Sequence, residues 1–167
     1  MPAQLARAAQ LREEARLAEE QGNIDRAEVL YVESRDIFMH EGGAYFIDTA
    51  LIMNAIASMK EKYGDHAGAL RAAEKSIQLM ENNADTDTSH KADEIRLQAW
   101  LIISRIRVQL AQYEEAEQVL LHALKHASTV FGETSEQTAA ARNQLTMLNT
   151  YKRGLEKRGE TLRRTFL

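Results

Sequence analysis

The sequence has no cysteine, one proline, eight glycines and one tryptophan among its 167 residues. The absence of cysteine excludes a disulfide-stapled scaffold, a cysteine nucleophile and a zinc site built from thiolates. Proline and glycine are too scarce for a collagen-like chain, and a hydrophobic content of 44% argues against disorder. A chain of this length buries about 70% of its unfolded surface in one core. We therefore expect a compact protein that is mainly helical.

Long hydrophobic runs are absent as well. The longest apolar stretch, residues 99–103, lies between Arg96 and Arg105 and is far shorter than the roughly 18 residues that cross a bilayer. The N-terminal segment alternates charged residues with alanine and leucine, so it lacks the continuous apolar region of a secretory signal. These absences favour a cytoplasmic location.

Chemistry-bearing motifs are also missing. The sequence contains neither a phosphate-binding glycine loop nor a nucleophile elbow. His122 and His126 are spaced to share one helix face and could bind a divalent metal together, but without a third ligand we interpret them as partly exposed polar positions. We expect no catalytic residues, no metal ligands and no cofactor.

An internal repeat is the main feature that is present. It is anchored at Gly22, Gly64 and Ala111, which are 42 and 47 residues apart. Each anchor has a large apolar residue eleven positions before it, a small residue seven before and alanine five after, followed by positions nine and twelve after. In the three units these five positions hold Leu11, Ala15, Ala27, Tyr31 and Ser34; Met53, Ala57, Ala69, Ala73 and Ser76; and Trp100, Ser104, Ala116, Leu120 and Ala123.

These offsets are multiples of helical turns on either side of a short turn, so each unit predicts two antiparallel helices. Small residues allow the two backbones to approach closely, and large residues fill the space between neighbouring pairs. We expect helices at 3–21, 24–40, 45–62, 66–82, 92–110, 113–131 and from 135 onward. The expected fold is an all-α, right-handed solenoid of three helix pairs with a C-terminal capping helix.

The pattern resembles the tetratricopeptide repeat, in which a bulky residue, a small residue, a glycine turn, an alanine and an aromatic fall at these offsets. The 42-residue spacing and the third unit are similar to the longer repeats of kinesin light chain. The resemblance covers about residues 5–150, and the second unit departs from it at Lys60, where an aromatic is usual, and at Ala73, where a bulky residue is usual. It implies a non-catalytic adaptor or scaffold that binds protein.

We place a repeat domain at residues 1–150, with units at about 8–41, 50–83 and 97–131 and the start of a fourth helix at 135–150. The polar segment 82–94 is predicted to be a surface loop. Residues 151–167 are predicted to be a basic amphipathic helical extension, because they carry a net charge of +4 and leave −8 for the other 150 residues. Its apolar residues continue a helical seam that consists of Leu145, Leu148, Leu155, Leu162 and Phe166.

The candidate binding residues lie on the first helix of each pair, because these helices line the concave side of a curved stack. They are Arg12, Arg16, Asn54, Ser58, Gln98, Leu101, Arg105, Asn143 and Met147. In kinesin-light-chain-like repeats an asparagine after the bulky residue holds the peptide backbone, so the resemblance implies this role for Asn54 and Asn143. The three arginines favour an acidic ligand, unless they pair with neighbouring carboxylates such as Glu13, Glu19 and Glu20.

Two functions remain open. The first is an adaptor that captures a peptide or helical segment of a partner protein in the concave groove. The second is a structural protein that forms a homo-oligomer through its C-terminal helix. The lysine, asparagine and arginine clamp for chaperone C-termini is not reproduced, and the net charge of −4 disfavours nucleic acid and membrane as partners.

Overall fold

The computed structural model describes residues 2–42, 45–83 and 89–166, and over these ranges it is helical without a strand. The helices are α1 (Pro2–Glu20), α2 (Ile24–His40), α3 (Phe46–Lys62), α4 (His66–Asn82), α5 (His90–Gln109), α6 (Tyr113–Phe131) and α7 (Glu136–Phe166). The predicted helices agree with these bounds to within two residues, so the all-α prediction is confirmed. None of the described helices combines the length and apolar character that crossing a bilayer requires.

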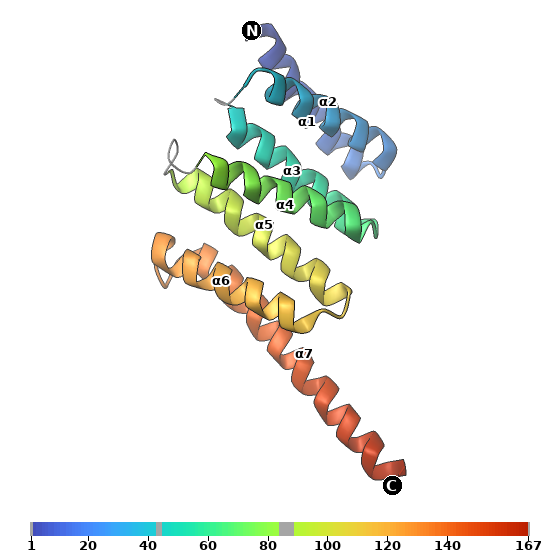
Figure 1. Ribbon diagram of the computed structural model, residues 1–167. Coiled ribbons are helices and arrows are strands. Elements are labelled where there is room, and N and C mark those ends of the chain that lie inside the picture. The colour runs from blue at the N-terminus through green and yellow to red at the C-terminus, as the bar shows by residue number, and fades with distance from the viewer. Residues whose placement is uncertain (1, 43–44, 84–88, 167) are drawn as a thin grey trace.

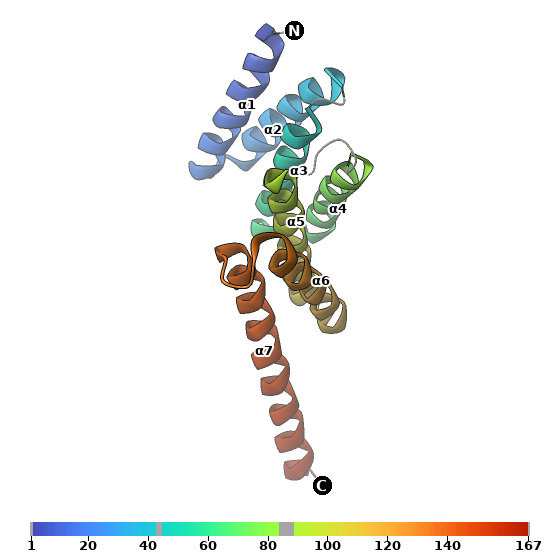
Figure 2. The same ribbon diagram turned by 90° about the vertical axis from the view of Figure 1, so that its left-hand side faces the viewer.

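The helices pack in the order of the chain (Figure 1). α1 pairs with α2, α3 with α4 and α5 with α6, and each pair contacts the next, so the molecule is a solenoid. Figure 2 shows α1 and α7 displaced to one side of α3 and α5, while α4 and α6 lie on the opposite side. The first helices of the pairs therefore line the hollow side of a curved stack.

The three turns inside the pairs have the same geometry. Gly22, Gly64 and Ala111 adopt positive φ angles of 77°, 87° and 59°. In each turn the following residue donates its backbone N–H to the carbonyl oxygen five residues earlier, at 2.9, 2.9 and 2.8 Å. This is the Schellman closure of a helix end, which normally uses glycine because a left-handed conformation costs no steric strain there. The repeat that the anchors predicted is therefore a repeat of structure.

The small residues of the repeat lie where the helices of a pair approach each other. Each is at most 1% exposed, and they are Ala15, Ala27, Ala57, Ala69, Ser104 and Ala116. One large core cluster extends from the first helix pair to α5 and includes Leu11 and Met53. Each pair thus completes the burial of its neighbour, as expected for stacked repeats.

The second unit packs despite its departures from the family pattern. Ala73 is fully buried. Lys60 places its Nζ 2.6 Å from a Glu28 oxygen of α2 and 3.1 Å from an Asp65 oxygen. The hydrogen bond with Glu28 raises the pKa of Lys60 above its usual range. An ion pair between the first two units therefore stands where an aromatic residue is usual.

α7 is one continuous helix of 31 residues. Its first half packs on α6 through Leu145 and Leu148, and the Lys152 Nζ lies 2.7 Å from a Glu117 oxygen. Beyond this point the helix leaves the body of the protein (Figure 1) and extends for about 20 Å at 1.5 Å per residue. The extension expected from residue 151 is thus the continuation of α7.

The polar connection expected at residues 82–94 is shorter in the structure, since α4 ends at Asn82 and α5 begins at His90. Residues 84–88 of that predicted surface loop lie outside the described residues.

Candidate peptide-binding groove

Three hollows follow one another along α5 on the hollow side of the stack. The α3–α5 hollow, of about 380 Å³, is lined by Leu51, Asn54, Ala55, Ser58, Gln98, Leu101, Ile102 and Arg105. A polar α5–α7 hollow, of about 330 Å³, shares Gln98 and Leu101 with it. An apolar α5–α7 hollow, of about 510 Å³, shares Arg105 with the first. Because they share side chains, the three hollows form one furrow, called the groove below.

The structure places most of the nine candidate residues in this groove. Those that line it are Asn54, Ser58, Gln98, Leu101, Arg105 and Met147. Arg12, Arg16 and Asn143 lie outside the three hollows. The repeat phase therefore identified the groove at its centre and was less accurate toward both ends of the stack.

Asn54 has one polar atom in use and one without a partner. Its side chain is 5% exposed, and its Nδ2 donates to the backbone oxygen of Ile95 on α5 at 3.0 Å. Its Oδ1 has no hydrogen-bond partner among the described residues. An amide both donates and accepts. Asn54 therefore spends its donor on joining α3 to α5, and only its acceptor remains for a ligand.

Arg105 forms a two-pronged ion pair with Glu61. Its Nε and Nη2 donate to the two Glu61 oxygens at 2.9 and 2.7 Å. The Glu61 side chain is only 9% exposed, whereas that of Arg105 is 41% exposed. Such bidentate pairs are strong and directional. The pair fastens the end of α3 to α5 and neutralises most of the charge that Arg105 would offer to a ligand.

The other two arginines also have carboxylate partners within the protein. Arg12 lies 3.4 Å from an Asp48 oxygen, which links α1 to α3. Arg16 pairs with Glu13 and Glu20, and its hydrogen bond lowers the pKa of the Glu13 carboxyl below its usual range. The alternative expectation, that these charges pair with neighbours, thus describes Arg16. The arginines supply less attraction for an acidic ligand than their number suggests.

At the C-terminal end of the groove the structure selects Gln144 in place of Asn143. Gln144 lines the apolar hollow, and its Oε1 accepts a hydrogen bond from the Ser104 hydroxyl at 3.0 Å. Met147 is 71% exposed at the same hollow, beside Tyr151, which is 46% exposed. Tyr151 had been assigned to the extension, and nothing in the repeat pattern marks it as a groove residue.

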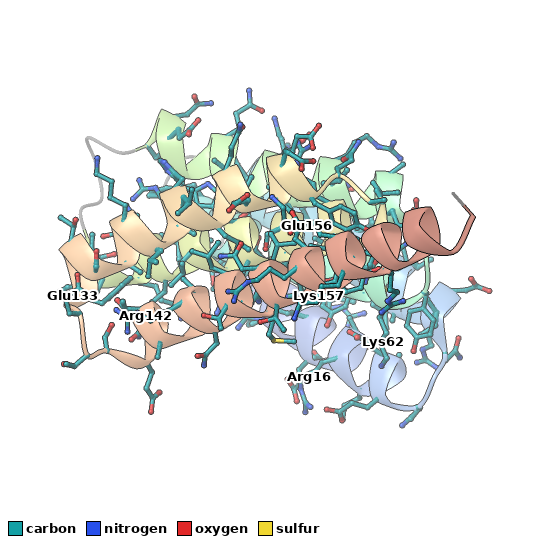
Figure 3. The ribbon with its side chains drawn as sticks, turned by 90° about the horizontal axis from the view of Figure 1, so that it is seen from below. Arg16, Lys62, Glu133, Arg142, Glu156 and Lys157 are labelled. Atoms are coloured by element: carbon teal, nitrogen blue, oxygen red, sulfur yellow. The ribbon has the colours of Figure 1, made fainter. Side chains whose placement is uncertain are left out.

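Figure 3 views the molecule from the end at which α7 leaves it. Glu156 and Lys157 lie on the emerging part of α7, and Arg142 lies with Glu133 near its start. The Arg142 Nη2 is 2.8 Å from a Glu133 oxygen. Arg142 thus forms an ion pair with the turn before α7 instead of lining the apolar hollow.

The histidine pair lies outside the groove. His122 and His126 place their rings edge-on against Trp100, with ring centroids 4.5 and 5.0 Å away. The His126 Nε2 is 3.1 Å from an Asp93 oxygen, in a direction unfavourable for a hydrogen bond. Burial lowers the pKa of His126, which favours neutral imidazole. Within the described ranges, no three histidine, cysteine, aspartate or glutamate side chains gather as metal ligands.

An all-α stack of helix pairs with a furrow on its first helices has the fold of tetratricopeptide-type repeat proteins. The crystal structure of BtubC (BKLC) from P. vanneervenii is similar to it, with a TM-score of 0.68 and 20% sequence identity. The match covers 90% of this chain and 66% of BtubC, just under two thirds. No model of a known protein family matches the sequence, and no curated protein does. The fold expected from the resemblance is thereby confirmed.

Proposed function

We propose that the protein is a non-catalytic adaptor that holds a peptide or short helix of a partner protein in the groove. The observation that carries this proposal is the continuity of the three hollows through Gln98, Leu101 and Arg105. Ligand sites are concave and mostly apolar with a few placed polar groups, and the groove has this composition. Its similarity in fold to BtubC adds no information about the partner.

The groove favours a ligand that is apolar at one end and polar at the other. The apolar α5–α7 hollow contains Val108, Met147, Leu148 and Tyr151. The neighbouring α3–α5 hollow offers the exposed side chains of Ser58 and Gln98 and is bounded by the paired guanidinium of Arg105. An amphipathic segment would bury its apolar side chains in the first hollow and direct its backbone polar groups to the second. A partly acidic segment remains compatible with the exposed part of Arg105.

Selection of displayed peptides on the full chain, followed by calorimetry of the selected sequences, tests the proposal. Met147→Glu places a charge in the apolar hollow and should weaken binding about tenfold or more. Leu121→Glu is the matched control, because Leu121 is 52% exposed on α6, outside the groove. Peptides that bind both variants as tightly as the unmodified chain would show that the groove is not the binding surface.

A further inference from the structure

The two ends of the solenoid carry opposite net charge. Residues 1–41, which include the first helix pair, have five basic and nine acidic residues and a net charge of −4. Residues 151–167 have six basic and two acidic residues and a net charge of +4. Figures 1 and 2 place α1 and α2 at one end of the molecule and the emerging part of α7 at the other. A single chain therefore cannot bring its own two charged ends together.

The emerging part of α7 is a helix without a helix partner from its own chain. Residues 153–166 extend the helix beyond the ion pair of Lys152 with Glu117. An isolated helix of about this length is marginal in water, because nucleation is costly and nothing buries its apolar residues. In the sequence, Leu155, Leu162 and Phe166 continue the helical spacing of seven and four. This segment is suited to a surface that is partly apolar and acidic.

Such a surface exists on α2 at the opposite end of the molecule. Asp25, Val29, Glu33 and Met39, called the α2 outer face below, fall within about 120° of one another at 100° per residue. Val29 is 56% exposed and Met39 51% exposed. Asp25 and Glu33 are exposed, and neither has an ion pair or side-chain hydrogen bond among the described residues. Two carboxylates and two apolar side chains are therefore accessible on one helix face.

We propose that the emerging part of α7 of one copy binds the α2 outer face of a second copy, so that the chains assemble head to tail. Complementary charge orients the contact, since opposite potentials favour association and like potentials oppose it. Pairing of two C-terminal helices would instead bring two segments of +4 together. A head-to-tail contact leaves a free head and a free tail, so it builds an open series or a ring. The groove takes no part in this contact and remains open to a partner.

Light scattering and sedimentation of the full chain at low salt measure the assembly. The average mass should rise with concentration above the 18.9 kDa of one chain and return toward it at about 0.5 M salt, where exposed charges are screened. A mass of one chain at every concentration in low salt would overturn the proposal.

Two variants test the two surfaces separately. The tail variant carries Arg153→Glu and Arg158→Glu, and the head variant carries Asp25→Lys and Glu33→Lys. These four side chains are exposed, so helix content by circular dichroism should be unchanged. Each variant alone should remain a single chain. A head variant that assembles like the unmodified chain would show that the tail binds elsewhere.

Mixing the two variants gives the sharpest result. The tail variant keeps an intact head and the head variant keeps an intact tail, so the mixture should form a one-to-one complex and stop there. A chain with all four substitutions exchanges the two charges and should regain assembly. The control is Glu74→Lys with Glu81→Lys on exposed positions of α4, which makes the same charge change and should leave assembly intact. A mixture without a complex overturns the head-to-tail contact and leaves the adaptor proposal untouched.

Discussion

The hydroxyl of Ser34 on α2 donates a hydrogen bond to the backbone oxygen of Ala8 on α1, 2.7 Å away. The same bond recurs one unit later, where the Ser76 hydroxyl lies 3.2 Å from the Ala50 oxygen. Both serine side chains are fully buried. The third unit has Ala123 at this position and therefore no such hydroxyl. The bond joins the two helices of a pair at the point where their backbones are closest.

Removing this hydroxyl should weaken the first pair. Ser34→Ala is expected to lower the free energy of unfolding by about 1 kcal/mol, the net value of a buried hydrogen bond. Ser58→Ala is the matched control, since Ser58 is exposed and should change stability little. Urea unfolding followed by circular dichroism measures both. Equal stability of the two variants would mean that the Ser34 bond contributes nothing.

Ala111 is a second site with a defined cost. It has a φ angle of 59° in a turn where Gly22 and Gly64 stand in the other units. Ala111→Gly should raise the free energy of unfolding by about 0.5–1 kcal/mol, because glycine relieves the left-handed strain. Gly64→Ala should do the reverse. A Cβ at Gly64 would meet no atom within 4 Å, so any loss of stability there would come from the backbone alone. Thermal unfolding of the two variants should shift in opposite directions.

The fold was predictable because its information is local and periodic. Small residues at Ala15, Ala57 and Ser104 recur at the spacing of helical turns, and only stacked helix pairs bury all of them together. The left-handed turn at Ala111 was found through the phase of the repeat, although the residue itself is not glycine. Helix pairs that contact mainly their neighbours in the chain leave few alternative arrangements.

The groove was only partly predictable, because its details depend on contacts between distant residues. Phase placed Asn54 and Arg105 on the correct face. It gave no indication that Asn54 would donate to Ile95, 41 residues away, or that Arg105 would pair with Glu61, 44 residues away. The prediction of Asn143 in place of Gln144 was one residue out, because packing on α5 and α6 sets the rotation of α7.

The Arg105–Glu61 pair should be a structural element of the groove. Arg105→Met leaves the Glu61 carboxylate, which is 9% exposed, without its partner. The expected loss is about 2 kcal/mol, less than for a fully buried pair because Arg105 itself is 41% exposed. Adding Glu61→Leu should recover most of it. A double-mutant cycle from urea unfolding measures the coupling, and additive effects of the two changes would contradict it.

His126 should make the protein less stable in mild acid. Burial lowers its pKa in the folded protein, and the nearby Asp93 carboxylate opposes this only in part, while Arg96 and His122 add to the lowering. The unfolded chain has an ordinary histidine pKa of about 6.5, so below that pH it binds a proton more readily than the folded protein does. The free energy of unfolding should therefore fall as the pH drops from about 7 toward 5.

His126→Gln removes this titration while keeping a polar side chain beside Asp93 and Trp100. The variant should lose less stability than the unmodified chain over the same pH interval, whatever its stability at neutral pH. Urea unfolding at several pH values between neutral and mildly acidic compares the two slopes. If the slopes are equal, His126 carries the same charge in the folded and unfolded chains, and the contact between Asp93 and the imidazole fully offsets the cost of burying the protonated ring.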